Sequence, residues 1–445
     1  MGWIVARNST MEEDAEQQQL LSATPEPRDD YNAAYSVFFA LGVGLILPWN
    51  AFISAVDYFQ VLYPDAHTDR VFALAYMFPC LFTLVYLTFY CRKFSASSRI
   101  NGGLTLFLAA IVLIPIVDQL FINGSQGSQA TQYVTVGAGI TMGIANAIME
   151  GSLVGVAGEL PERYMQAFVA GTAGSGVIAS VLRVITKGAL PQTVQGLRLS
   201  ANIYFCVTAI FLSICILAYN LVYKLPIMVY YTNLKLDALE SAVQNNTDDQ
   251  EHVAPKSVTN SEEMEHTSIH DRIVSVSKMV DPVSYWWVWS QIKWLAISAT
   301  IIYLVTLSIF PGYITEDVHS AYLGNWYPVL LILSYNVFDL LGKMLTSVYT
   351  IKSQKVMISG SFTRLVFFPL FYMVLHGPSV LRTEVLVFIL TSLLGVTNGY
   401  FTSVHMIVAP KTVSLLEAET AGIIMVLFFV SGLLLGSLLS WVWII

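Results

Sequence analysis

A polar stripe with two opposite charges interrupts one of the most apolar stretches of the chain. The stretch reads YPVLLILSYNVFDLLGKMLTSVY over residues 327–349, and it places Asn336, Asp339 and Lys343 at positions i, i+3 and i+7. On a helix these side chains fall within about 60° of arc. An Asp and a Lys four residues apart can pair, which lowers the cost of burying both charges. The stripe predicts a structural ion pair between helices, a substrate or coupling-ion site in a cavity, or both.

A second acid lies in the apolar stretch GAGITMGIANAIMEGSLVGVAG, residues 137–158. Asn146 and Glu150 are one helical turn apart, so they share a face, and the small residues around them let a neighbouring helix approach closely. Glu150 is either a protonated, hydrogen-bonded core acid or a cavity acid that takes up and releases a proton. Asn146 could orient it in both cases.

Other polar residues in apolar stretches have more ordinary explanations. In LILPWNAFISAVDYF, residues 45–59, Pro48 can kink a helix, while Trp49 is either a packed aromatic or a side chain that stacks on a planar ligand. Charges near the ends of such stretches are expected to extend toward water; they are Asp57, Arg183, Lys187 and Arg364. A lone His405 is expected to be structural.

The composition indicates which class of protein positions these polar groups. Hydrophobic residues make up 55% of the 445 residues and charged residues only 12%, about half of what soluble domains carry. The formal net charge of −8 argues against a nucleic-acid binder, and four Cys exclude a disulfide scaffold. No metal-ligand spacing, phosphate-binding loop or nucleophile motif is present, so we expect no enzyme, no cofactor and no metal. A polytopic membrane protein remains.

Eleven apolar stretches are each long enough to cross about 30 Å of hydrocarbon as a helix. We expect an all-α fold with spans at 33–57, 70–91, 101–122, 131–156, 164–189, 200–223, 294–311, 326–350, 357–376, 384–408 and 418–444. The predicted organisation is a tail over 1–30, a six-helix bundle over 31–223, a largely disordered loop over 224–292 and a five-helix bundle over 293–445.

Positive charges near the span ends predict the orientation. Near the span ends, the tail and the loops that should share its side carry twelve Lys and Arg, against four near the span ends on the opposite side. Because cytosolic loops are enriched in these residues, we expect the N-terminus and the long loop in the cytosol and the C-terminus on the far side.

Short motifs outside the spans bear on processing. The tail contains Glu16 four residues before the pair Leu20 and Leu21, which resembles an acidic dileucine signal that directs membrane proteins to lysosomes or vacuoles. The plasma membrane is the alternative. Of the glycosylation sequons, only the one at Asn123 faces away from the cytosol in this topology.

Six blocks of the sequence resemble the equilibrative nucleoside transporters, and among them the plant members most closely. The resemblance covers about residues 31–445 apart from 224–292. Its blocks are LPWNAF at 47–52, GSLVGVAGELPERYMQAFVAGTAGSG at 151–176, FPGYITED at 310–317, YNVFDLLGK at 335–343, NGYFTSVHMIVAPK at 398–411 and EAETAGIIM at 417–425. Several long blocks in order are more specific than any single motif.

The resemblance implies a fold similar to the major facilitator transporters and a central cavity that carries nucleosides, such as adenosine and uridine, by alternating access. Family binding positions match Trp49, Asn50, Ile53, Met77, Cys80, Glu150, Asn336, Asp339 and Lys343, and a cytosol-side gating position matches Arg99. No partner protein is implied, and we expect a monomer in the lipid bilayer.

Two residues depart from the family pattern. Many members have Gln at the position of Glu150, and animal relatives often have Arg at that of Lys343, so a bidentate contact is lost there. An acid at position 150 suits either proton coupling, with Asp339 as a second candidate, or a cationic substrate. A carrier of organic cations or other small polar solutes on the same fold is therefore the alternative function.

Overall fold

The computed structural model describes residues 26–64, 68–122, 127–248, 269–277, 284–310, 320, 322–378 and 382–440. Within these ranges the regular structure is helical and no strand occurs. The chain divides into two compact units. We call Tyr35–Tyr219 with Pro282–Ile445 the helical unit, and Met1–Ala34 with Asn220–Asp281 the accessory unit.

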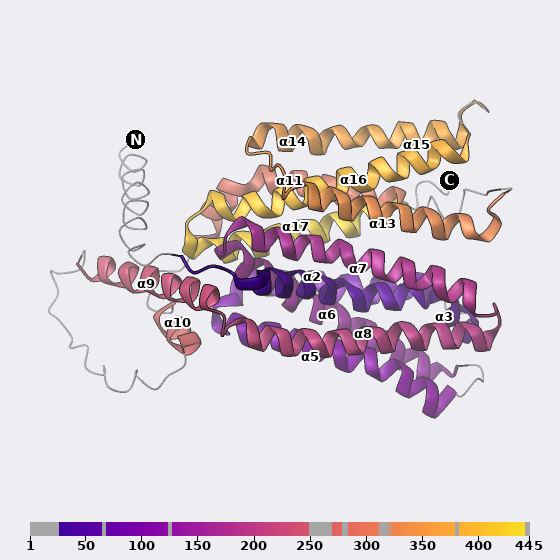
Figure 1. The fold of residues 1–445 in the computed structure, drawn as a ribbon, viewed down its shortest axis with the longest axis horizontal. Helices are drawn as coiled ribbons and strands as arrows, with labels where there is room; N and C mark the ends of the chain where they lie inside the picture. Colours follow the sequence, from indigo (N-terminus) through magenta and orange to yellow (C-terminus); the bar gives the residue numbers. More distant parts are fainter. Residues whose placement is uncertain are drawn as a thin grey trace. The chain divides into compact units, whose positions relative to one another are not determined.

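Eleven spans in the described residues are long and apolar enough to cross a membrane, which confirms the predicted all-α class and span number. Figure 1 shows the long helices lying roughly side by side. They are α2 (Ala33–Ser54), α4 (Thr68–Tyr90), α5 (Ala96–Val117), α6 (Gln129–Glu159), α7 (Glu162–Ala189), α8 (Val194–Val222), α11 (Tyr285–Ile309), α13 (Tyr327–Leu345), the pair α14 (Gln354–Thr363) and α15 (Phe367–His376), α16 (Glu384–Val408) and α17 (Leu415–Leu439).

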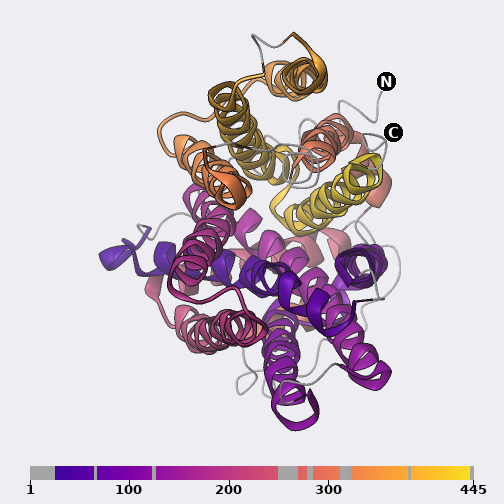
Figure 2. The same ribbon diagram turned by 90° about the vertical axis from the view of Figure 1, so that its right-hand side faces the viewer.

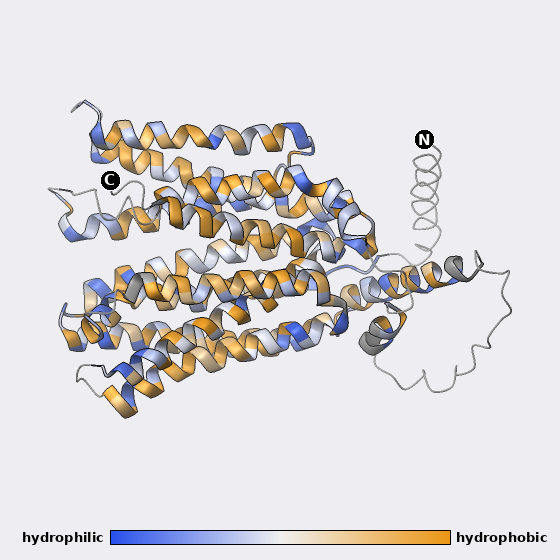
Figure 3. Cartoon of the chain, turned by 180° about the vertical axis from the view of Figure 1, so that it is seen from behind, coloured by the Kyte–Doolittle hydropathy of each residue, from blue (hydrophilic) through white to orange (hydrophobic). Residues whose placement is uncertain are grey.

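The outer surface of the helical unit is apolar. Phe82, Ile210 and Leu217 are each about two-thirds exposed, and many other large apolar side chains are exposed with them. In Figure 3 hydrophobic residues predominate along the helices, while hydrophilic ones gather near the helix ends. A protein in water rarely exposes so much contiguous apolar surface, so these side chains fit contact with lipid.

Two bundles make up the helical unit, one from α2 to α8 and the other from α11 to α17. Figure 2 shows the first in the lower part of the view and the second in the upper part. They meet mainly where α7 packs on α13 and α6 packs on α17. Small residues allow tight helix packing in α7. A Cβ atom on Gly171 would lie 2.0 Å from the carbonyl oxygen of Phe39 in α2, so only glycine permits this approach.

Several span boundaries differ from the predictions by a few residues, and the start of α11 differs most among the span starts. Helix α11 begins at Tyr285, nine residues before the predicted position 294. The Trp-rich stretch before Lys293 continues the helix, because tryptophan is favourable at the membrane interface, and Ser284 caps it by accepting a hydrogen bond from the Trp287 N–H at 3.4 Å.

The segment predicted as a largely disordered loop also contains helices, which belong to the accessory unit. They are α9 (Pro226–Asp248) and α10 (Ile269–Ser277). In α9, Ile227, Met228, Leu236 and Leu239 are buried, an apolar face that the prediction overlooked because it weighed the polar sequence after residue 243. The two helices contact each other, and Arg272 pairs with Glu240 at 2.9 Å.

Three predicted features lie outside the described residues. They are the dileucine motif at Glu16, Leu20 and Leu21, the sequon at Asn123, and all but the first residue of the block at 310–317.

Candidate functional site

The predicted pair on α13 forms and is buried. Lys343 Nζ lies 3.1 Å from Asp339 Oδ2, and the two residues are 5% and 6% exposed. The other carboxylate oxygen of Asp339 accepts a hydrogen bond from Asn398 Nδ2 of α16 at 2.8 Å. Asp339 thus has a donor at each of its two carboxylate oxygens.

Lys343 also links the two bundles. Its ammonium group donates to Thr172 Oγ1 of α7 at 3.0 Å. Helix α7 also bonds to two further predicted residues. Asn50 Nδ2 of α2 donates to Ser175 Oγ at 2.7 Å, and Asn336 Nδ2 of α13 donates to Ser180 Oγ at 2.7 Å.

Thr172 and Ser180 of α7 therefore bond to the second bundle, and Ser175 of α7 bonds to α2 of the first. We call these three residues the α7 hydroxyl row. The sequence analysis gave these residues no role, because small residues in a span also suit close helix packing. Three hydroxyl residues within nine positions of one predicted span were the signal that could have found them.

The acid of the first bundle has a different environment. Glu150 Oε2 accepts a hydrogen bond from Asn146 Nδ2 at 2.9 Å. Glu150 is half-buried, and among the described residues no basic side chain forms an ion pair with it. Asn146 Nδ2 also lies 3.6 Å from Cys80 Sγ, so the structure brings the predicted residues Cys80 and Glu150 together. Lys343 is near enough to Glu150 to interact electrostatically.

Trp49 stacks on a protein ring. Its ring centroid lies 4.1 Å from that of Tyr76 in α4, at an interplanar angle of 28°. Trp49 and Met77 are half-buried, whereas Ile53 is 41% exposed. The interpretation of Trp49 as a packed aromatic thus holds for one face, and Tyr76 is an aromatic that the sequence analysis missed.

One predicted location is wrong. Arg364 does not extend toward water, because it is 2% exposed at the midpoint of the span Gln354–Val374. It donates to Thr306 Oγ1 at 2.8 Å and to Asn398 Oδ1 at 3.3 Å. Bonds to these polar atoms replace the water that an end position would have given it. Asn398 was quoted in a sequence block but received no role, although an amide inside an apolar span was a signal.

His405 is structural, as expected. It is fully buried, its ring lies 2.8 Å from Ser298 Oγ of α11, and its other nitrogen bonds to the carbonyl of Phe401 at 2.7 Å. His405 therefore joins α16 to α11 through Ser298.

A buried ion pair joins the bundles at the end of the unit that we call the Arg99 end. Arg99, near the start of α5, pairs with Glu419 in the first turns of α17. Lys411 Nζ donates to the carbonyl of Leu160 at 2.7 Å, a second contact between bundles. Glu417 instead bonds to Ser414 as part of a capping box.

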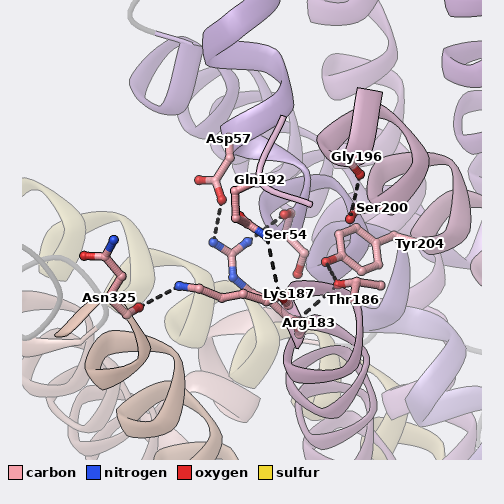
Figure 4. A network of polar contacts seen from close by, with 10 residues as sticks. All are labelled: Ser54, Asp57, Arg183, Thr186, Lys187, Gln192, Gly196, Ser200, Tyr204 and Asn325. Atoms are coloured by element: carbon pink, nitrogen blue, oxygen red, sulfur yellow. Dashed lines mark hydrogen bonds and ion pairs between the residues drawn. The ribbon is translucent and has the colours of Figure 1, made fainter. Parts of the chain in front are cut away.

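The opposite end, which we call the Arg183 end, is polar and more exposed. Figure 4 shows Arg183 directed toward Asp57 and Lys187 reaching the backbone of Asn325. Arg183 pairs with Asp57 at 2.8 Å, and Lys187 Nζ donates to the Asn325 carbonyl at 2.6 Å. These two basic residues and Asp57, with Tyr204 and other residues, line a small pocket. The Lys187 bond links the two bundles here.

Tyr58 lies beside that pocket on the short helix α3 (Val56–Leu62) and donates to Asp118. Burial, together with this hydrogen bond, raises the pKa of Tyr58. Asp118 also pairs with Arg198 of α8 at 2.6 Å. The group fixes the helix ends around the pocket.

Comparison with known proteins gives consistent results along the chain. A family described as nucleoside transporter matches residues 137–445. The Arabidopsis thaliana protein named equilibrative nucleotide transporter 1 is 47% identical over 427 residues, which cover 95% of this chain and 89% of that protein. Equilibrative nucleotide transporter 8 of the same plant is 42% identical over 420 residues, which cover 94% and 97%.

Solved structures share the fold at low sequence identity. The proton:xylose symporter XylE of the major facilitator superfamily superimposes with a TM-score of 0.60 at 12% identity, covering 93% of this chain and 89% of that one. The Escherichia coli fucose:proton symporter FucP gives a TM-score of 0.54 at 10% identity and covers 92% of each chain. These similarities confirm a fold like that of the major facilitator transporters.

Proposed function

The chain belongs to the nucleoside transporter family, and from this premise we propose that it carries purine and pyrimidine nucleosides, such as adenosine and uridine, across a membrane by alternating access. The α7 hydroxyl row carries the proposal within the structure. Polar residues of both bundles converge on this one helix, and transporters bind substrate near the bilayer midplane between their two halves.

We assign the predicted residues roles that follow from their chemistry. Trp49 stacks on the base with the face that Tyr76 leaves open. Glu150 and Asn336 hydrogen-bond base or ribose edges, and Asp339 with Lys343 binds ribose hydroxyls. Asn50 orients the α7 hydroxyl row, and Ile53, Met77 and Cys80 form the apolar wall.

Alternating access needs contacts that break at one end while those at the other hold. We propose the Arg99–Glu419 pair as the gate at the Arg99 end, supported by its burial and its position between bundles. At the Arg183 end the bond from Lys187 to the backbone of Asn325 is more exposed. From the charge distribution we place the Arg99 end in the cytosol.

Glu150 is the proposed proton-coupling residue. It has one neutral amide partner, so binding a proton breaks no ion pair among the described residues. A protonated carboxyl group can donate to a substrate, whereas an ionised one only accepts. Proton binding and substrate binding are then linked. Protonation of Asp339 would break its ion pair with Lys343, so we assign the coupling to Glu150 rather than to Asp339.

A cationic substrate is the second candidate, favoured by the same observation. An amine could provide the positive partner that Glu150 lacks among the described residues. Uptake of labelled adenosine and of a labelled organic cation should be compared in cells that lack their own carriers. We expect saturable adenosine uptake that unlabelled cation does not inhibit. The reverse pattern would replace the nucleoside assignment.

The membrane and the assembly state are also proposals. We propose the vacuolar membrane, on the dileucine motif, and a monomer, because one chain contains both bundles and the whole α7 hydroxyl row. Changing Leu20 and Leu21 to Ala should move a fluorescently tagged protein to the plasma membrane. An unchanged location would remove the sorting argument without affecting the transport assignment.

A further inference from the structure

Arg364 is a buried cation that the proposed transport mechanism does not use. No carboxylate among the described residues forms an ion pair with it. Burial of an unpaired charge is costly, so a residue of this kind in the middle of a span calls for an explanation.

The guanidinium group is held by neutral acceptors from two helices. From α11 these are Thr306 Oγ1 at 2.8 Å and the carbonyl of Ile302 at 3.2 Å. From α16 they are Asn398 Oδ1 and the carbonyl of Leu394, both at 3.3 Å. Arg364 also begins the short 3-10 turn that separates α14 from α15, which places its side chain between α11 and α16.

The contact with Asn398 determines which way that amide points. A guanidinium group has donors only, so the amide atom that faces Arg364 must be the oxygen. The amide nitrogen then faces the opposite direction, and there it donates to Asp339 Oδ1 at 2.8 Å. Thr306 cannot fix the amide in this way, because its hydroxyl has one proton and two acceptors in reach, Ile302 O and Asn398 Oδ1.

We propose that Arg364 is a positioning residue that fixes the carboxylate of Asp339 through the side-chain amide of Asn398. The inference rests on the proposed function, since Asp339 is assigned there to substrate binding. Without Arg364 the amide can rotate and present its oxygen to the carboxylate, which repels it. The substrate then meets a displaced or differently bonded Asp339, and its affinity falls.

A double-mutant cycle tests whether the effect passes through the amide. The variants are Arg364→Met, Asn398→Leu and the two combined, with labelled adenosine uptake measured over a range of concentrations and normalised to the amount of tagged protein in the membrane. Each single change should raise the half-saturating adenosine concentration by about tenfold or more, as expected for loss of a hydrogen bond to a charged group. The double variant should be no worse than Asn398→Leu alone.

His405→Asn is the matched control, because His405 also joins α16 to α11 through buried hydrogen bonds. It should change protein abundance at most and leave the half-saturating concentration within about twofold of the wild type. If Arg364→Met does not reach the membrane, the cycle is run with Arg364→Lys, which retains the charge but not the planar donors.

The outcomes separate the two claims. Multiplying effects in the double variant, or an unchanged half-saturating concentration in Arg364→Met, would overturn the positioning role while leaving nucleoside transport intact. Absence of adenosine uptake by the wild type would instead overturn the proposed function.

Discussion

Asp339 and Glu150, the two acids assigned to the transport site, are held in opposite ways. Asp339 is 6% exposed and lies between an ammonium group and an amide. Glu150 is half-buried and has one amide partner, Asn146. Removing the charge of Asp339 would leave Lys343 buried without its counter-ion, whereas no such partner is stranded when Glu150 becomes neutral. Asp339 is therefore an acid fixed by a counter-ion, whereas Glu150 forms no ion pair among the described residues.

Removal of the fixed acid should have the largest effect. Asp339→Ala leaves Lys343 buried without a carboxylate, at a cost of about 3–5 kcal/mol. We expect adenosine uptake to disappear and the amount of protein in the membrane to fall severalfold, both measured on the same cells by isotope uptake and by blotting of a tag.

A companion variant separates the loss of adenosine uptake from the loss of protein in the membrane. Asp339→Ala combined with Lys343→Met contains no stranded charge, so it should recover near wild-type abundance and remain inactive. Recovered transport in that variant would mean that the pair is structural only. Unrecovered abundance would mean that the stranded lysine is not what destabilises the single variant.

The ion pair between Arg99 and Glu419 provides an independent test of whether paired charges contribute to transport. Arg99→Ala removes the ion pair with Glu419, so the Arg99 end should close less often and uptake should fall by about tenfold. Exchanging the charges, Arg99→Glu with Glu419→Arg, should recover a large part of the loss. If uptake by Arg99→Ala equals that of the wild type at equal abundance, Arg99 is not a gate.

A smaller effect is expected at Glu150, because its hydrogen-bond partner Asn146 is neutral. Asn146→Leu removes one uncharged donor from Glu150, which corresponds to about 1 kcal/mol, or about fivefold in affinity. Because Asn146 is the hydrogen-bond partner of this acid, its loss should also shift the pH at which uptake is half-maximal. Adenosine uptake measured across a pH series gives both quantities, and an unchanged series would show that Asn146 does not tune the acid.

Much of this arrangement was accessible from sequence because helical periodicity fixes neighbours within one helix. Asp339 and Lys343 are four residues apart, as are Asn146 and Glu150, and both pairs form as expected. The number of spans followed from apolar length alone.

Partners on different helices were harder to predict, because periodicity says nothing about which faces meet. The contact of Lys343 with Thr172 joins residues 171 positions apart. Arg364 was misplaced for the same reason: its position suggested a route to water, whereas its acceptors come from α11 and α16. Stacking of Trp49 on Tyr76 likewise depends on the packing of α2 against α4.

The most direct test of the account is labelled-adenosine flux at two imposed pH gradients, with the wild type beside Glu150→Gln. Glutamine retains the shape of the side chain and can still bond to Asn146, but it cannot exchange a proton. The account predicts that wild-type uptake into the cytosol rises when the opposite compartment is acidic, and that Glu150→Gln exchanges adenosine at the same rate under both gradients. An identical pH response in the two proteins would contradict the account and leave Glu150 as a hydrogen-bonding ligand only.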